Sequence, residues 1–264
     1  MKKIIYLLIV LAIISCSSND DSGTNTPEES YNYFPLTSGT YWTYNNESDQ
    51  GISRDSLFIG GSEEVNGKTY RSLGAEQPAS GFMTLLLSRS LLRSTDTELI
   101  LNGELGAPPV EGFPEISIPL NDVVLYDAIA NNGTVLSEVS GEIEQTVQDI
   151  PLIIGYTIKT IQDETIENSF EGNITVMKSK IIVNLSIDAE VELIPGTTVT
   201  IPVLASQDIV VVTNQFAENI GLINSETNIQ YELEDLGVIG DELPFPSEDT
   251  QTANQVIDNY NIVN

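Results

Sequence analysis

Residues 181–193 alternate between apolar and polar side chains, and this segment constrains the fold more than any other. Its regularly spaced apolar members are Ile181, Val183, Leu185, Ile187, Ala189, Val191 and Leu193. Of the residues between them, only Ile182 is apolar. A period of two predicts a β-strand, whose successive side chains point to opposite faces. One dry face and one wet face indicate an antiparallel sheet, because parallel sheets are usually covered on both sides.

Other segments repeat this pattern. In 135–147, valines and an isoleucine share one face and glutamates share the other. Turn signals lie at Asn66-Gly67, at Asn132-Gly133 and at Pro195-Gly196. The second of them comes just before the predicted strand 135–147. Two stretches could be helical, 82–93 and 253–259, although the first reads equally well as an apolar strand. We therefore expect an all-β fold with at most one or two short helices.

No linker-like break divides the chain after residue 31. Four prolines, Pro108, Pro109, Pro114 and Pro119, are expected to shape one long loop rather than a boundary. The sequence predicts a single antiparallel β domain over 31–264.

The first sixteen residues have the architecture of an export signal. Lys2 and Lys3 precede an apolar run over 4–14. That run is shorter than the roughly 20 apolar residues that a membrane-spanning helix needs. Residues 13–16, Ile-Ile-Ser-Cys, resemble a bacterial lipobox, which implies a signal peptide at 1–15 and cleavage between Ser15 and Cys16. The resemblance also implies acylation of Cys16 by palmitate-type chains, which would anchor the mature protein to a membrane.

Residues 16–30 are predicted to form a flexible acidic stalk, because 17–30 contain no large apolar residue. Ser17 to Asp21 is similar to the export signals of Bacteroidota lipoproteins that reach the outer face of the outer membrane. This similarity implies a lipid-anchored, surface-exposed protein. The alternative is that the segment after Cys16 is only a stalk and carries no signal for export to the cell surface.

Charge and composition exclude several classes of function. The chain has a net charge of -29, and removal of Lys2 and Lys3 makes the mature body more negative. Nucleic acid is therefore not an expected partner. There is no histidine, and Cys16 is the only cysteine, so Ser-His-Asp and Cys-His catalysis are excluded. No nucleotide or calcium motif occurs, and we expect no cofactor or metal.

Some patterns leave weaker alternatives. A carboxylate-based glycan hydrolase needs only two acids, and acidic clusters occur at 63–64, 232–235 and 241–242. Solvated loops explain these clusters more simply. Arg71, Arg89 and Arg93 could hold an anion, although pairing with neighbouring carboxylates is the favoured interpretation. Asp55-Ser56-Leu57 matches a short O-glycosylation pattern of exported Bacteroidota proteins.

The segment 33–44, YFPLTSGTYWTY, resembles the start of a group of uncharacterised Bacteroidota lipoproteins. Segments 66–70, NGKTY, and 216–223, FAENIGLI, are similar to the same group. The resemblance implies a strongly curved antiparallel sheet or half-barrel, like that of lipoprotein-carrier proteins. It implies no biochemical activity.

Aromatic residues are concentrated in the first predicted strand. Tyr41, Trp42 and Tyr44 could contact a ligand such as a sugar, with Trp42 and Tyr44 on one face and Tyr41 on the other. The favoured interpretation places Trp42 and Tyr44 in the core, because large aromatic side chains dominate core burial.

The sequence favours a non-enzymatic outer-membrane lipoprotein that acts as a binding or structural module. Its expected partners are the membrane, through Cys16, and an extracellular protein, a glycan or an apolar ligand. The alternative is a carrier that holds a lipid or another apolar ligand inside a curved sheet. A carboxylate hydrolase is the least favoured function.

Overall fold

A computed structural model describes residues 31–106, 116–168, 172, 174–194, 196–236 and 246–263. The signal peptide, Cys16 and the stalk lie outside these residues, and their roles stay predictions. The strands are β1 (Tyr41–Ser48), β2 (Gly51–Val65), β3 (Lys68–Ala75), β4 (Leu91–Ser94), β5 (Glu98–Gly106), β6 (Ser117–Asp127), β7 (Val135–Val147), β8 (Ile150–Asn168), β9 (Ile174–Ile194), β10 (Thr197–Ala217), β11 (Gly221–Glu232) and β12 (Glu248–Asn261). One helix, α1 (Phe82–Ser88), occurs among the described residues.

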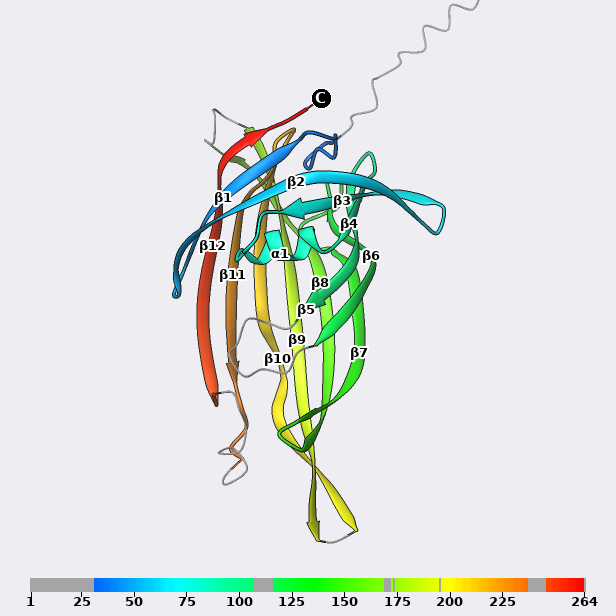
Figure 1. Ribbon diagram of the computed structural model, residues 1–264, viewed down its shortest axis with the longest axis vertical. Helices are drawn as coiled ribbons and strands as arrows, with labels where there is room; N and C mark the ends of the chain where they lie inside the picture. Colours follow the sequence, from blue (N-terminus) through cyan, green and yellow to red (C-terminus); the bar gives the residue numbers. More distant parts are fainter. Residues whose placement is uncertain are drawn as a thin grey trace, which may run out of the picture.

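All the strands belong to one 12-stranded antiparallel sheet, in the order β6-β5-β4-β3-β2-β1-β12-β11-β10-β9-β8-β7. The sheet is strongly curved, as expected, and it curls so far that it forms a nearly closed barrel (Figure 1). The hairpin of β9 and β10 extends beyond the other strands at one end (Figure 1). The prediction of an all-β, curved antiparallel fold is confirmed.

Side chains bridge the two edges of the sheet where the strands themselves do not pair. The backbone N–H of Val124 in β6 donates to Ser137 Oγ in β7, over 2.9 Å. Thr160 Oγ1 of β8 donates to the Val124 carbonyl over 2.6 Å. Gln162 of β8 accepts from the Asp127 backbone N–H over 3.1 Å. These bonds satisfy backbone groups that an open edge would leave exposed.

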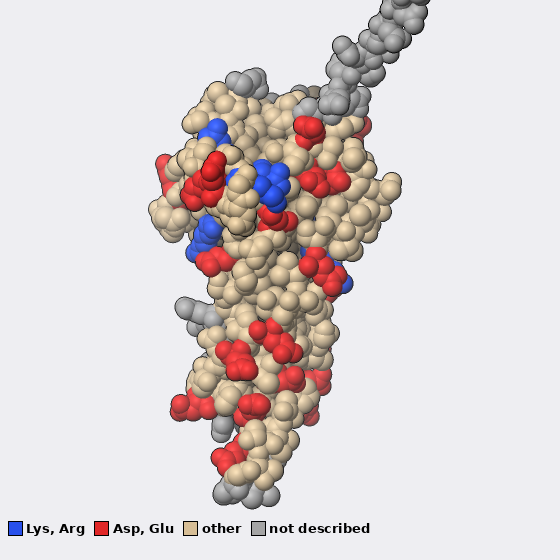
Figure 2. Space-filling model, turned by 90° about the vertical axis from the view of Figure 1, so that its right-hand side faces the viewer, with Lys and Arg blue, Asp and Glu red and all other residues tan. Residues whose placement is uncertain are grey.

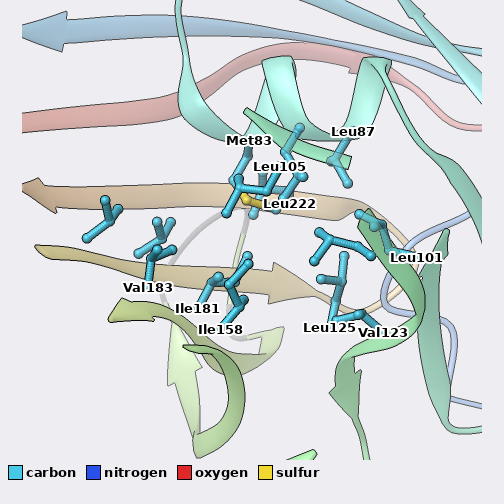
Figure 3. Close-up of a cluster of buried hydrophobic side chains, with 14 of the residues drawn as sticks. Met83, Leu87, Leu101, Leu105, Val123, Leu125, Ile158, Ile181, Val183 and Leu222 are labelled. Carbon is cyan, nitrogen blue, oxygen red and sulfur yellow. The ribbon is translucent and has the colours of Figure 1, made fainter. Parts of the chain in front are cut away.

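The core lies inside the curve. The alternation in 181–193 is reproduced in β9, where Ile181, Val183, Leu185 and Ile187 are buried. The helix adds Met83 and Leu87 to this core, both without exposed area. Figure 3 shows Met83 beside Leu105 of β5 and Leu222 of β11. The short helix therefore packs within the concavity rather than on the outside.

The turn at Asn66-Gly67 connects β2 to β3, with φ of 52° and 76° at its two residues. Positive φ at both positions is the requirement of a type I′ hairpin turn, which Asn-Gly meets with little strain. The Asn132-Gly133 signal precedes β7 and the Pro195-Gly196 signal separates β9 from β10. The positions of the strands confirm the first two turn signals; of the third, Gly196 lies between the two strands and Pro195 lies outside the described residues.

Three sequence expectations need correction. The segment 82–93 is helical only to Ser88 and then enters strand β4. The segment 253–259 is not a helix but part of β12. Pro119 lies within β6 rather than in a loop, and it is tolerated because β6 is an edge strand that pairs only with β5. The other three prolines lie outside the described residues.

Candidate functional site

The aromatic residues of β1 divide as the period of two requires. Trp42 and Tyr44 have no exposed area, whereas Tyr41 is 38% exposed. Trp42 stacks on Phe34 with ring centroids 4.8 Å apart. Its Nε1 donates to the Ile220 carbonyl over 2.6 Å. Burial also raises the pKa of Tyr44 far above its usual range. Trp42 and Tyr44 therefore pack the core and offer no surface to a sugar.

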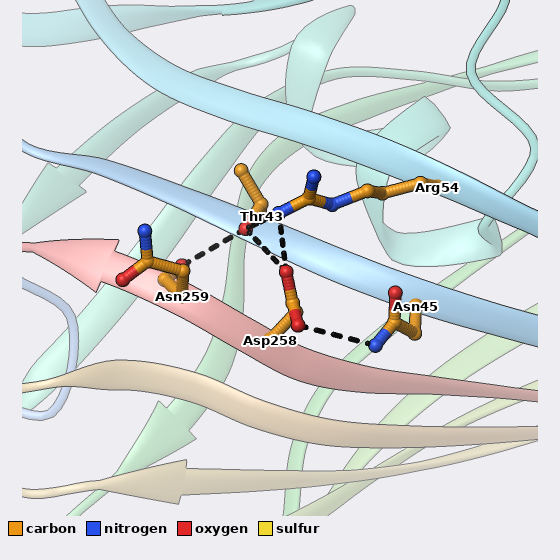
Figure 4. A network of polar contacts seen from close by, with 5 residues as sticks. All are labelled: Thr43, Asn45, Arg54, Asp258 and Asn259. Atoms are coloured by element: carbon orange, nitrogen blue, oxygen red, sulfur yellow. Dashed lines mark hydrogen bonds and ion pairs between the residues drawn. The ribbon is translucent and has the colours of Figure 1, made fainter.

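The outer face of β1, β2 and β12 carries polar side chains in addition to Tyr41. Figure 4 shows Arg54, Asp258 and Thr43 joined across β2, β12 and β1. Arg54 forms an ion pair with Asp258 and donates to Thr43 Oγ1 over 3.2 Å. Asn45 Nδ2 donates to the other Asp258 oxygen over 3.3 Å. These groups satisfy one another, so this face reads as a solvated sheet surface.

The Asp55-Ser56-Leu57 pattern lies in the middle of β2. Leu57 is fully buried and Asp55 is only 2% exposed. Asp55 accepts hydrogen bonds from the backbone N–H groups of Ser80 and Gly81, over 3.0 and 2.8 Å. Its carboxylate thus fixes the segment that leads into α1, a role that the sequence did not predict. Ser56 is half-buried on the opposite face.

The three arginines do not gather at one site. Arg71 donates to Ser62 Oγ over 2.7 Å. Arg93 lies over the Tyr70 ring, 5.7 Å from its centroid. Within the described residues, neither they nor Arg89 forms an ion pair with a carboxylate. Neither the anion site nor the favoured carboxylate pairing is thus seen for this group.

The structure describes two of the three acidic clusters, 63–64 and 232–235. Glu63 and Glu64 are exposed beside the β2–β3 turn. Residues 241–242 lie outside the described part of the chain. Over the described ranges, no group of three His, Cys, Asp or Glu residues could hold a metal ion. No described helix has the length and apolarity needed to cross a membrane.

A cavity of about 350 Å³ lies beside the helix, and we call it the α1 cavity. It lies between α1, the β1–β2 turn, the end of β5 and the inner faces of β11 and β12. Its apolar lining comprises Ile52, Phe82, Leu85, Leu86, Leu105, Ile229 and Ala253. Ligand sites are typically about 300 to 1,000 Å³ and mostly apolar. The α1 cavity has the size and lining of a small-molecule site.

Charged residues around the α1 cavity are mainly acidic. Glu47 and Asp49 come from the β1–β2 turn, Glu104 from β5, and Arg89 from the residue after α1. Asp49 accepts from the Thr252 backbone N–H over 3.1 Å, and Glu104 accepts from Ser117 Oγ over 2.7 Å. Figure 2 shows acidic side chains scattered over one face, with Lys and Arg only in its wider upper part.

A row of polar side chains crosses the inside of the sheet at the level of the α1 cavity. Cross-strand pairing places one member on each of seven neighbouring strands, which are β2, β1, β12, β11, β10, β9 and β8. In sheet order the members are Ser53, Asn46, Gln255, Ser225, Asn214, Ser179 and Gln162. All but Ser53 are at most 7% exposed. We call this set the polar row, and its first four members line the cavity.

Several atoms of the polar row have no hydrogen-bond partner among the described protein groups. They include Asn46 Oδ1, Gln255 Oε1 and Ser225 Oγ beside the cavity, and both polar atoms of the Asn214 side chain. Buried polar atoms are nearly always hydrogen-bonded, because an unsatisfied one costs about 1 to 3 kcal/mol. Three of these atoms belong to residues that line the cavity, so its wall holds buried polar groups that the described protein does not satisfy.

Comparison with known proteins gave likeness of fold only. No family model matches the chain. No curated protein matches it. A putative lipoprotein from Parabacteroides distasonis is 14% identical, with a TM-score of 0.42 over 88% of this chain and 99% of that one. A putative exported protein with a YmcC-like fold from Bacteroides fragilis is 14% identical, with a TM-score of 0.39 over 86% of this chain and 98% of that one. Likeness at this level transfers no activity, ligand or partner.

Proposed function

We propose that this chain is a non-enzymatic lipoprotein of the outer membrane that binds a small, partly apolar molecule in the α1 cavity. The cavity itself carries the proposal, because its volume of about 350 Å³ and its apolar lining suit a compact ligand. At roughly 30 Å³ per water-sized group, the space would take a molecule of about a dozen heavy atoms.

The proposed site differs from the sites of two functions that the sequence suggested, a lipid carrier and a glycan-binding module. A lipid carrier needs a long open interior, but the inside of the sheet around Trp42, Tyr44 and Phe216 is filled by packed side chains. A binding module for glycans through the β1 aromatics would need Trp42 or Tyr44 at the surface, and both are buried. Binding beside α1 avoids both difficulties.

The membrane location rests on the leader. Cys16 after an apolar run and Ser15 supports acylation, and the following Ser-plus-acidic segment supports a place on the outside of the cell. Replacement Cys16→Ala should abolish palmitate labelling and membrane association. A Cys16→Ala protein that still labels and fractionates like the parent would contradict the anchor.

The non-enzymatic part of the proposal rests on composition. The chain has no histidine, and its only thiol is the predicted acylation site. Among the carboxylates at the α1 cavity, Asp49 and Glu104 are each occupied by a hydrogen bond to the protein. We therefore assign the cavity to binding rather than to hydrolysis.

A small neutral fluorescent molecule, 2-naphthol, matches the size of the cavity and tests binding there. We expect one saturable site on residues 17–264, which contain all twelve strands and the helix. Leu85→Trp should abolish this site, because Leu85 is only half-buried and its side chain borders the cavity. Ile129→Trp is the matched control, since Ile129 is 66% exposed and does not line the cavity. Equal binding by the two variants would refute the location of the site.

A further inference from the structure

The electrostatic character of the α1 cavity restricts what it can bind. Glu47, Asp49 and Glu104 border it, and Arg89 is the only described cationic residue in its lining. The body around it is also acidic, with 39 acidic against 10 basic residues in the whole chain. A guest with a negative charge would meet repulsion both at the rim and from the protein as a whole.

A further carboxylate lies behind the cavity wall. Asp55 is 2% exposed and forms no ion pair with a described residue. Among the described residues, its oxygens accept from Ser80, through the backbone N–H and the hydroxyl, and from the Gly81 N–H. Both of these residues line the cavity. The segment between Asp55 and the cavity is thus held by dipoles and carries no compensating positive charge.

Two carbonyl oxygens of the polar row strengthen this bias. Asn46 uses its amide nitrogen to donate to Ser53 Oγ and Ser80 Oγ, over 3.2 and 3.1 Å. Gln255 uses its amide nitrogen to donate to Thr84 Oγ1 over 2.7 Å. The donors are therefore occupied, while Asn46 Oδ1 and Gln255 Oε1 have no donor from the described protein.

These two oxygens converge on one point. A Cβ atom on Gly81 would lie 2.4 Å from Gln255 Oε1 and 2.8 Å from Asn46 Oδ1. Gly81 also lines the cavity, so the two acceptors lie directly behind its wall. Ser225 Oγ, next along the polar row, is likewise without a partner in the described chain. Acceptor oxygens are therefore concentrated behind the wall at the inner end of the cavity.

We infer that the ligand of the α1 cavity is an amphipathic organic cation, an ammonium group on a small apolar body. This inference rests on the proposed function and specifies the chemistry of the same site. The ammonium group brings positive charge to the carboxylates at the rim and into the field of the buried oxygens behind the wall. The apolar body contacts Leu85, Leu86 and Leu105. A metal ion alone would leave this apolar lining without a contact. A fatty acid would place its carboxylate beside the acidic residues of the cavity, which would repel it.

Three compounds with one tail and different head groups test the inference. Hexylamine, hexanol and hexanoate are titrated into residues 17–264 at pH 7 by calorimetry. We expect hexylamine to bind about tenfold more tightly than hexanol, as a charged hydrogen bond implies, and hexanoate to bind least. Added salt should weaken the binding of hexylamine and leave the binding of hexanol unchanged, because only the charged head group is screened.

A charge variant gives a second readout. Gln255→Glu replaces the amide that donates to Thr84 Oγ1 by an oxygen that can accept from the Thr84 hydroxyl, and it should strengthen hexylamine binding several-fold. Gln230→Glu makes the same charge change on the exposed outer side of β11 and should have little effect. No binding of any of the three compounds would refute the proposed function. Binding of hexanol or hexanoate as tightly as hexylamine, or equal effects of the two variants, would leave the cavity as a site and refute the cation.

Discussion

Two buried tyrosines allow the same atom to be removed with opposite consequences. Tyr44 and Tyr70 are 0% and 1% exposed. The Tyr44 hydroxyl has no partner in the described protein, whereas the Tyr70 hydroxyl donates to Asp122 Oδ1. Tyr44→Phe removes an unsatisfied group and should raise the free energy of unfolding by about 1 kcal/mol. Tyr70→Phe removes a bond to a charged acceptor and should lower it by about 1 to 2 kcal/mol, at the low end because Asp122 is partly exposed.

The two variants are compared by urea unfolding, with the fluorescence of Trp42, the only tryptophan, as the signal. We expect unchanged slopes and midpoints that move in opposite directions. The pKa of Asp122 is lowered by its hydrogen bonds from Lys68 and then Tyr70. The deficit of Tyr70→Phe should therefore be present above the ordinary aspartate pKa and shrink as the pH falls through the lowered value. Equal destabilisation by both substitutions would refute the reasoning, because it would mean that the Tyr44 hydroxyl is bonded.

Three further predictions concern pH and packing. Burial, followed by the nearby Glu218, raises the pKa of Tyr33 to about 12; the stability linked to it is complete below the ordinary value of 10 and is lost at higher pH, so tyrosinate absorbance should show a delayed class that appears with unfolding. Lys180 lowers the pKa of Asp163; the resulting stability is present above the ordinary aspartate value and lost in acid, and Lys180→Met should flatten this part of the pH profile. Gly221→Ala should lower the thermal midpoint markedly, because φ is +120° and the new Cβ would lie 2.8 Å from the Trp42 indole nitrogen.

The strands and turns were predictable wherever one face of the sheet is dry. The buried residues of β9 from Ile181 to Ala189 follow the alternation that the sequence shows. Asn66-Gly67 marks its turn because both residues must adopt positive φ. The near closure of the sheet was not predictable from these segments. It depends on side-chain bonds between strands that do not pair with each other, such as that of Thr160 to Val124.

The misprediction of 253–259 has the same cause as the missed site. In β12 the buried member at this level is Gln255, while Val256 is 40% exposed. The usual order of polar and apolar residues is therefore reversed, and the segment loses its strand signature. Asn214, between buried Val212 and Phe216 in β10, shows the same reversal.

Such reversals were visible in the sequence and could have indicated the polar row. A polar residue in phase with apolar neighbours on several strands marks buried polar groups. The α1 cavity could not be found in this way. It combines a turn, a short helix and parts of β5, β11 and β12, which only the folded sheet brings together.

NMR spectra of the leucine methyl groups, recorded on leucine-labelled protein, test the site most directly. During titration with hexylamine, the methyl signals of Leu85 and Leu86 in α1 and of Leu105 in β5 should shift and saturate together, because these side chains line the α1 cavity. Leu152 and Leu185, which are buried but do not line it, should remain unchanged. Shifts confined to leucines outside the α1 cavity, or no saturable shift at any leucine, would contradict the account.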